Sequence, residues 1–237
     1  MKIQVIYEDN HLIAVFKQAG VLSQPTHKAT AWRSQSDKTG DISIYDEVKK
    51  YLKDKYKKQG KVFLGLLHRL DRPVSGIILF AKTSKGASRI SEQFRNKEIE
   101  KIYQAIIIGK PDKSRGVLIN KIQKSKIKNQ NYNVKFKSEE SKVGDSVILY
   151  YEVLKSSDKY SLLKIRIDTG KFHQIRAQLS LARMPILGDK KYGSKEAFID
   201  QNIALCATNL IFKSATGDKI VKLSVDLPQN WHNFIEF

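Results

Sequence analysis

The strand-like segments of this sequence, and the way helices interrupt them, limit its fold more than any other feature. Most of the chain consists of short runs rich in Ile and Val that are bounded by polar turns, as in β-strands. These runs mix with helical segments without a regular strand-helix-strand alternation, which favours an α+β fold with a largely antiparallel mixed sheet. The expected strands are Lys2–Tyr7, His11–Phe16, Ile77–Ala81, Lys101–Ile108, Val147–Val153, Ser161–Ile167, Ala204–Phe212 and Lys219–Val225.

Three segments are predicted to be helices. Ser43 can cap the first, Ile44–Lys58, because a serine hydroxyl accepts a hydrogen bond from an amide of the first helical turn. The second begins at Thr83 or Ser84 and repeats apolar residues at helical spacing. The third is predicted over His173–Met184.

Length and apolar content indicate a folded protein. With 237 residues, of which 41% are hydrophobic, the chain can bury a substantial core, and no repeat or Pro-rich linker divides it. No apolar run approaches the roughly 18 residues of a membrane span, so we expect a cytoplasmic protein. The single cysteine, Cys206, lies in an apolar run and is expected to be a core thiol.

The net charge is the strongest compositional indication of a partner. Lys and Arg number 43 against 24 Asp and Glu, which gives a formal charge of +19. Such an excess attracts polyanions, most simply nucleic acid, although a lysine-rich surface without a specific partner would give the same composition. The excess concentrates in Lys110–Lys137, where nine basic residues accompany one acid, Asp112, and the local charge is +8.

One carboxylate lies between two arginines in the segment HRLDRPVSG, residues 68–76, directly before the apolar run Ile77–Ala81. Arg69 and Arg72 flank Asp71, and a planar guanidinium group holds a carboxylate in a fixed geometry better than a lysine does. Two interpretations remain open from this pattern alone. Asp71 is either a structural ion-pair partner at the start of a strand, or a nucleophile or general base whose charged form the arginines favour.

Other common chemistries lack their motifs. The chain has no GxxxxGK[ST] segment and no strand-borne GxGxxG loop, so we expect no nucleotide cofactor. Its five histidines include no metal-spaced pair, and the chain has no cysteine cluster, so we expect no metal site. No GxSxG segment marks a serine nucleophile. A carboxylate therefore remains the candidate reactive group.

Four motifs in order resemble the RluA family of RNA pseudouridine synthases, from about Glu8 to about Phe212. They are HRLDR-x-x-SG at residues 68–76, K-x-Y at 101–103, TG-x-x-HQIR at 169–176 and PILGDKKYG at 185–193. The resemblance implies a pseudouridine synthase fold with two lobes and an active-site cleft between them. It also implies an isomerase, free of cofactors, that converts uridines of ribosomal or transfer RNA to pseudouridine.

The resemblance further implies roles for single residues. Asp71 matches the catalytic aspartate, Arg176 the pocket arginine that pairs with it, and Tyr103 the tyrosine that stacks on the target base. From alternation alone, Tyr103 would equally fit the buried face of a strand. The expected substrate-binding residues are His68, Arg69, Arg72, His173, Gln174, Leu205, Lys124, Lys126 and Lys128.

Three points distinguish this chain from the family pattern. Members often have Arg-Thr where Lys171 and Phe172 stand, and an acidic or polar residue plus Thr where Pro73 and Val74 stand. The synthase pattern also begins almost at Met1, so we expect residues 1–237 to form a single catalytic domain without a separate N-terminal RNA-binding module. RNA capture is then expected to rest on the basic segment Lys110–Lys137.

We expect the partner to be RNA rather than DNA or a membrane, and the protein to be a monomer. The competing hypothesis is a non-catalytic RNA-binding or ribosome-assembly protein that kept the fold and lost the reaction. The presence of Asp71, Tyr103 and Arg176 argues against it, because a degenerate site has no reason to keep a carboxylate and its arginine.

Overall fold

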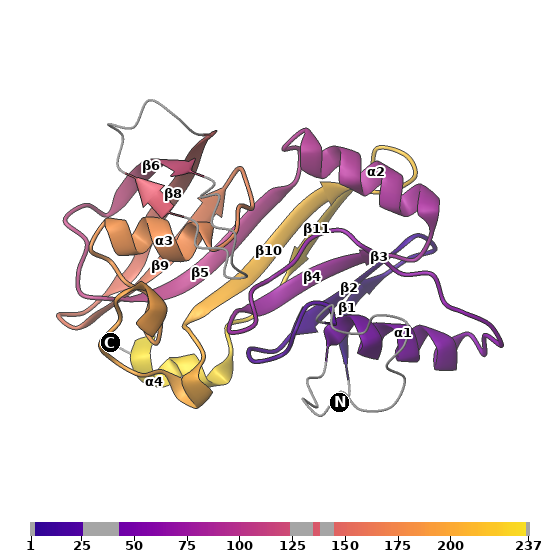
Figure 1. Cartoon of the computed structure of the whole chain (residues 1–237), viewed down its shortest axis with the longest axis horizontal. Helices are drawn as coiled ribbons and strands as arrows, with labels where there is room; N and C mark the ends of the chain where they lie inside the picture. Colours follow the sequence, from indigo (N-terminus) through magenta and orange to yellow (C-terminus); the bar gives the residue numbers. More distant parts are fainter. Residues whose placement is uncertain (1–2, 26–42, 124–134, 138–144, 236–237) are drawn as a thin grey trace. The chain divides into compact units, whose positions relative to one another are not determined.

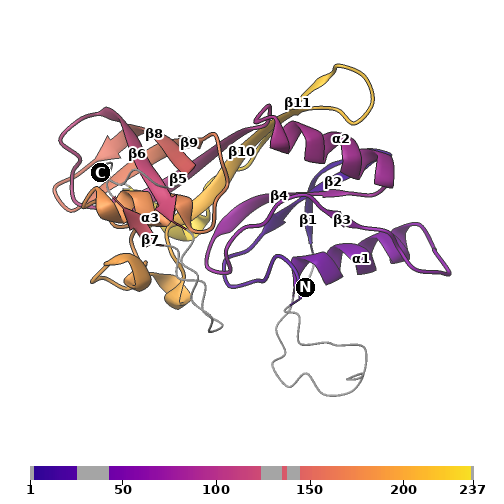
Figure 2. The same ribbon diagram turned by 45° about the horizontal axis from the view of Figure 1, so that its top comes forward.

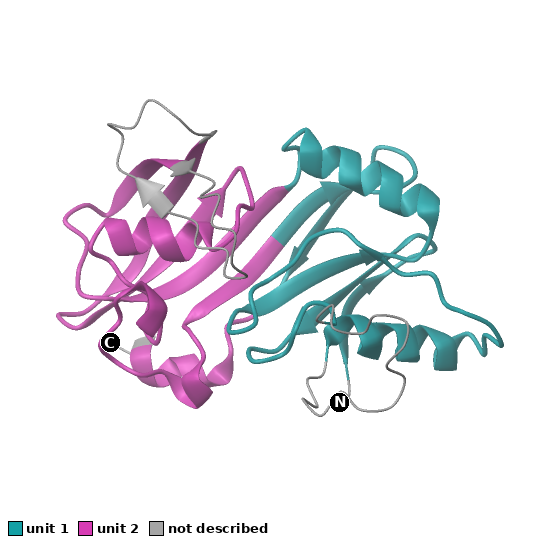
Figure 3. Ribbon diagram, viewed as in Figure 1, with its two compact units in different colours: residues 1–99, 210–225 teal, residues 100–209, 226–237 magenta. Residues whose placement is uncertain are grey.

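The computed structural model describes residues 3–25, 43–123, 135–137 and 145–235, which form two compact units. Unit 1 comprises residues 1–99 and 210–225, and unit 2 comprises residues 100–209 and 226–237 (Figure 3). Strand β10 (Leu205–Lys213) runs from unit 2 into unit 1, because the boundary falls within it. Both units combine antiparallel strands with a few helices, which confirms the predicted α+β class.

Antiparallel strands form the centre of unit 1. The tight turn between the first two exists because the Asp9 carboxylate accepts hydrogen bonds from the amides of His11 and Leu12, both at 2.7 Å. Strand β2 then pairs with β4, and β3 pairs with the far end of β4. The strands of this unit are β1 (Gln4–Glu8), β2 (Leu12–Lys17), β3 (Gly65–Leu66), β4 (Ser75–Ala81) and β11 (Ile220–Ser224), which pairs with β10.

Two helices cover opposite faces of these strands: α1 (Ile44–Lys55) on one and α2 (Ser84–Arg95) on the other (Figures 1 and 2). Alternate side chains of β2 and β4 therefore enter different cores, and every residue of β4 is buried. The core under α2 includes Leu12, Ala14, Ile77, Leu79 and Ile90. The core under α1 includes Ile13, Val15, Ile44, Val48, Ile78 and Phe80.

The predicted starts of the first two helices are confirmed, and the predicted end of the first is wrong. The Ser43 hydroxyl accepts a hydrogen bond from the amide of Asp46, and the Thr83 hydroxyl caps α2 in the same way. Helix α1 ends at Lys55 rather than Lys58, because the backbone of Lys57 turns left-handed with a φ of 47°.

Antiparallel strands also form unit 2, in the order β5-β9-β8-β6-β7. The strands β8 and β9 pair through a short turn. The sequence analysis did not predict β6 or β7, because the lysines of this stretch hid the alternation of Val117 and Ile119. The strands are β5 (Glu100–Ile108), β6 (Arg115–Gln123), β7 (Lys135–Lys137), β8 (Asp145–Ser156) and β9 (Tyr160–Ile167).

Helix α3 (Gln174–Leu181) lies against β6 and β8. It is shorter than predicted, because His173 and Arg183, which flank it, have left-handed backbones with φ of 55° and 60°. Cys206 is fully buried in β10, as expected for a core thiol. The remaining elements are the short helices η1 (Lys190–Tyr192), η2 (Ile199–Gln201), η3 (Gln229–Trp231) and α4 (His232–Ile235).

Within the described residues, no helix is both long enough and apolar enough to cross a membrane.

Candidate active site

Buried charge identifies the candidate site. Among the residues that the structure describes, Lys17, Arg176 and Asp189 are the charged side chains that are buried, with exposed fractions of 0%, 5% and 1%. A buried charge costs free energy unless it is paired or well hydrogen-bonded. Arg176 and Asp189 belong to two of the sequence motifs, and Lys17 interacts with a third.

The Asp71 motif forms a hydrogen-bonded turn in unit 1. The amide of Val74 donates to the carbonyl of Asp71 at 3.1 Å, and β4 begins directly afterwards at Ser75. The preceding residue, Leu70, is fixed from both sides by Ser23, whose hydroxyl donates to the Leu70 carbonyl at 2.6 Å and accepts from the Leu70 amide at 3.0 Å. The half-buried Asp71 carboxylate is therefore mounted on a fixed backbone.

A buried lysine lies beside this turn. The Nζ of Lys17 donates to the carbonyls of Gln18, Val21 and Arg72 at 3.1, 2.7 and 3.1 Å. Burial lowers the pKa of Lys17 to about 7, the charge of Asp71 opposes that shift, and the charge of Arg72 adds to it. Lys17 thus ties the end of β2 to the candidate catalytic turn, and in its charged form it interacts with Asp71.

The other residues of this motif have identifiable contacts. The Nε2 of His68 accepts a hydrogen bond from the amide of Leu79 at 3.0 Å, and its ring lies 5.3 Å from that of Phe94. The Nε of Arg72 donates to the carbonyl of Gly20 at 2.9 Å, and the side chain is exposed. Arg69 is exposed as well. These positions leave the substrate-binding roles of the three residues as predictions.

The third and fourth motifs meet through a buried ion pair in unit 2. Arg176, on α3, donates from Nε and from one terminal nitrogen to the two carboxylate oxygens of Asp189, at 2.7 and 2.8 Å. This two-point geometry fixes the guanidinium plane. The guanidinium carbon also lies 5.0 Å from the centre of the Tyr192 ring. The ion pair therefore holds the helix and the segment after it in one arrangement.

An aromatic stack continues from this pair. A hydrogen bond of 2.9 Å joins Nδ1 of His173 to the hydroxyl of Tyr192, and the two rings meet edge to face. The ring of His173 also contacts Phe172. The two rings are stacked, with centroids 3.8 Å apart and an interplanar angle of 18°. The TG-x-x-HQIR motif thus presents an aromatic pair at its surface.

Gln174 and Gln178 anchor the same helix from inside. The Oε1 of Gln174 accepts a hydrogen bond from the hydroxyl of Thr169 at 2.6 Å, and its Nε2 donates to the carbonyl of Ile148 at 3.2 Å. The Nε2 of Gln178 donates to the carbonyl of Leu118 at 3.0 Å. Gln174 is buried, with an exposed fraction of 2%, so these contacts give it a structural part besides any contact with substrate.

The K-x-Y motif lies on β5. Tyr103 is half-buried and pairs with Ile165 of β9, while Ala105 on the same side of the strand is fully buried. Burial lowers the pKa of Lys101, and the charge of Asp168 opposes that shift. Leu205, the first residue of β10, has an exposed fraction of 3%.

Two expectations lie beyond these observations. Lys124, Lys126 and Lys128 fall outside the described residues. Asp71 belongs to unit 1 and Arg176 to unit 2, so their pairing remains a prediction.

Among the described residues, no group of three or more His, Cys, Asp or Glu side chains could hold a metal ion.

Lys17, Ser23 and Asp189 were not predicted as site residues from the sequence. Lys17 is the last residue of an apolar strand and was not distinguished from the many surface lysines. Asp189 belongs to the motif PILGDKKYG. The sequence signal that could have identified it is an acid directly before two lysines, Lys190 and Lys191. Lys17 and Ser23 contact Arg72 and Leu70, which lie 55 and 47 positions away, and no local pattern records such contacts.

Comparison with protein families gives one match over most of the chain. A family described as RNA pseudouridylate synthase matches residues 11–181, a range that contains Asp71, Tyr103 and Arg176. The chain is 35% identical over 226 residues to the ribosomal large subunit pseudouridine synthase C of Rickettsia typhi, which covers 94% of this chain and 68% of that protein. It is 30% identical over 191 residues to the ribosomal large subunit pseudouridine synthase D of Borreliella burgdorferi, covering 81% and 55%.

Solved structures share the fold. The human RNA pseudouridylate synthase domain containing 4 superposes with a TM-score of 0.75 at 22% identity, covering 97% of this chain and 92% of the other. The human RNA pseudouridylate synthase domain containing 1 gives a TM-score of 0.70 at 18% identity, with 96% and 84% covered.

Proposed function

The chain belongs to the RNA pseudouridylate synthase family, and we propose that it converts specific uridines of ribosomal RNA to pseudouridine with Asp71 as the nucleophile. The family places it among isomerases that act on RNA. The choice of ribosomal RNA is supported by relatives named ribosomal large subunit pseudouridine synthases, one of which matches 94% of the chain. The proposed role of Asp71 is supported by its motif and by the turn that fixes its backbone.

The reaction explains why a fixed carboxylate is needed. The bond from the sugar C1′ to N1 of uracil breaks, the uracil turns within the site, and a new bond joins C1′ to C5. The C5 hydrogen leaves as a proton, and N1 regains one, so atoms and electrons balance without an oxidant or a metal. We propose that Asp71 forms a covalent bond to the nucleotide, which holds one fragment while the other turns, and that this bond breaks again once C1′ is joined to C5, so that the carboxylate is regenerated.

Access to the uridine requires base flipping. A glycosidic bond inside a stacked or paired segment cannot be reached by a side chain, so the nucleotide must leave the stack, which costs a few kcal/mol. We propose that Tyr103 replaces part of the lost stacking with its ring. Arg176 is proposed to contact the site from a guanidinium that Asp189 holds in one plane.

We also propose that the chain acts as a monomer in the cytoplasm. Molar mass measured by light scattering, with and without an RNA fragment, tests the first part of this proposal.

Release of tritium from RNA labelled at uracil C5 tests the proposed function, because that hydrogen is lost in the reaction. The substrate is a transcript of large-subunit ribosomal RNA. Asp71→Asn keeps the size of the side chain and removes its charge, so turnover should vanish while melting temperature and RNA affinity stay close to those of the unsubstituted protein. Measurable tritium release by a pure Asn variant would contradict the assignment. Release from neither protein, with RNA still bound, would favour the non-catalytic alternative.

A further inference from the structure

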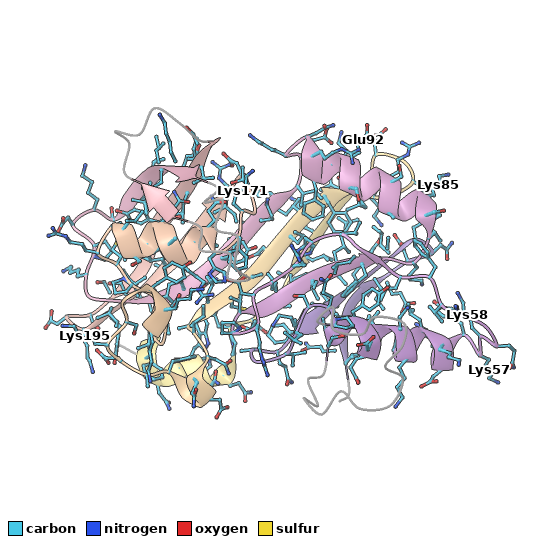
Figure 4. The ribbon with its side chains drawn as sticks, viewed as in Figure 1. Lys57, Lys58, Lys85, Glu92, Lys171 and Lys195 are labelled. Atoms are coloured by element: carbon cyan, nitrogen blue, oxygen red, sulfur yellow. The ribbon has the colours of Figure 1, made fainter. Side chains whose placement is uncertain are left out.

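We propose that Phe172 provides a second RNA contact, in which its ring stacks on an unpaired base of the substrate. The inference rests on the proposed function only in taking RNA as the ligand. It concerns binding, and not the atoms that react. Phe172 lies in the loop before α3, next to Lys171, whose side chain is labelled in Figure 4.

The exposure of Phe172 is the first observation. Its exposed fraction is 49%, in a motif whose other apolar and amide side chains, such as Gln174 and Ile175, are buried. An aromatic ring left in water forgoes the free energy that its burial would contribute. The ring is therefore available to a ligand.

The support beneath the ring is the second observation. One face of Phe172 rests on His173, which hydrogen-bonds to Tyr192. The guanidinium of Arg176 lies over the ring of Tyr192, and the ion pair with Asp189 fixes that guanidinium. A chain of contacts thus runs from a buried ion pair to an exposed ring.

The backbone adds to this rigidity. His173 has a φ of 55°, a left-handed conformation that is uncommon for residues other than glycine and is found at functional sites when the surroundings impose it. An aromatic group that is already fixed loses little conformational entropy when it binds a ligand. Such preorganisation is typical of a binding surface.

Charge favours RNA as the occupant. Lys171, Lys190 and Lys191 are exposed, and in the sequence they lie within two positions of the aromatic residues of the stack. The neighbouring acid, Asp189, is already paired with Arg176. Cations next to an exposed ring match a nucleic acid strand, in which phosphates alternate with flat bases. A chain with a net charge of +19 would repel a second copy of itself.

Two variants and a matched control test this proposal. Phe172→Ala removes the ring, whereas Phe172→Trp enlarges it. Phe63→Ala is the control, because Phe63 is an equally exposed phenylalanine, at 50%, in unit 1. The probes are a short single-stranded adenosine RNA and a duplex RNA of the same length, whose bases are already stacked on each other.

Phe172→Ala should weaken binding of the single strand about 5-fold to 140-fold, which is the range of 1 to 3 kcal/mol for one stacked base at 1.4 kcal/mol per factor of ten. Phe172→Trp should bind at least as well as the unsubstituted protein, and the added indole fluorescence should be quenched by the single strand. Binding of the duplex should stay the same in all variants, and Phe63→Ala should bind both probes normally.

Three results would overturn the proposal. The first is an unchanged affinity of Phe172→Ala for the single strand. The second is an equal loss for the duplex, which would indicate a change of fold rather than loss of stacking. The third is reduced self-association of Phe172→Ala with normal RNA affinity, which would mean that a second copy covers the ring. Because these measurements need no turnover, they remain decisive if Asp71 proves not to be the nucleophile.

Discussion

At the scale of single residues, the burial of charge separates Lys17 from the other lysines of the chain. Most lysines are exposed, whereas the Lys17 side chain has no exposed surface and donates to three carbonyls. The sequence analysis expected Arg69 and Arg72 to supply the positive charge around Asp71. The structure adds a buried Lys17 amine, whose pKa is lowered to about 7 by burial even though the charge of Asp71 opposes that shift.

Lys17→Met should flatten the pH dependence of stability. Between pH about 7 and the ordinary pKa of 10.5, the unfolded chain binds a proton at this residue that the folded protein lacks. The free energy of unfolding therefore rises with pH in this window, by up to about 1.4 kcal/mol per pH unit. Urea denaturation of both proteins at several pH values measures the slope.

The exposed Lys58→Met serves as the control, since it removes a surface lysine of the same unit. Equal slopes for the unsubstituted protein and Lys17→Met would show that Lys17 does not titrate in this range. Lys17→Met should also lower the rate of isomerisation, because the turn that carries Asp71 loses its link to β2.

Substitutions of Tyr103 distinguish stacking from core packing. If its ring stacks on the flipped base, Tyr103→Phe should keep RNA affinity and Tyr103→Ala should lose about 1 to 3 kcal/mol of binding free energy. If the ring only packs against its neighbours on β5, the Ala variant should instead lose several kcal/mol of stability, as buried aromatics do. Melting curves and RNA affinities of both variants decide between these outcomes. An Ala variant that melts far lower but binds RNA normally while folded would exclude stacking.

At the scale of elements, long-range hydrogen bonds hold the motif segments in place. The turn at residues 70–74 precedes a strand that is buried on both faces, and residues 17–23 hold it from the other side. Helix α3 is anchored by Gln174 and Gln178, which donate to the carbonyls of neighbouring strands. The candidate reactive groups are therefore carried by segments with few alternative positions.

Ser23→Ala should reduce turnover by loosening the turn. The substitution leaves the buried amide and carbonyl of Leu70 without the Ser23 hydroxyl, which costs about 1 to 3 kcal/mol of stability. Because Leu70 directly precedes Asp71, we expect kcat to fall as well. Ser157→Ala is the matched control, since the Ser157 hydroxyl likewise donates to a carbonyl and accepts from an amide, both of Tyr160, in the turn between β8 and β9 of unit 2. Identical kcat values for the two variants would refute the role of Ser23.

At the scale of the whole molecule, the positive charge is spread over the surface of both units. Exposed lysines labelled in Figure 4 include Lys57 and Lys85 of unit 1 and Lys195 of unit 2. Several acids are already paired. Glu8, for example, binds Lys55 and Lys82, and these hydrogen bonds outweigh burial and lower the pKa of its carboxyl to about 2. The remaining excess of lysine is available to a polyanion.

A triple substitution tests whether the basic segment Lys110–Lys137 binds the phosphates of RNA. Lys124, Lys126 and Lys128 changed to Gln should weaken RNA binding and reduce the slope of log affinity against log salt by roughly 0.7 to 0.9 for each lost phosphate contact. The control changes Lys57, Lys58 and Lys85 to Gln, which removes the same charge from unit 1. A docking role predicts a flatter slope for the first triple variant alone. Equal slopes for both would mean that the segment is an ordinary solvated surface.

The local patterns of the sequence predicted most elements and the composition of the motifs. Short runs rich in Ile and Val predicted the strands around β2, β4, β5 and β9, and the caps Ser43 and Thr83 marked two helix starts, because these signals depend on neighbours within a few residues. The ends of α1 and α3 differed, since backbone turns at Lys57 and His173 stop the helices. Strand β6 was missed among its lysines.

The contacts of the site were decided by the tertiary structure. Lys17 meets the carbonyl of Arg72, 55 positions away, and Ser23 meets Leu70 at a separation of 47. Arg176 was predicted as a site residue from its motif, but its bond to Asp189 depends on how the chain folds back after α3. Sequence patterns specify which residue types are present and which local structure they prefer. Desolvation and hydrogen bonding between distant segments determine which of the many charges become buried, and only the folded chain brings those segments together.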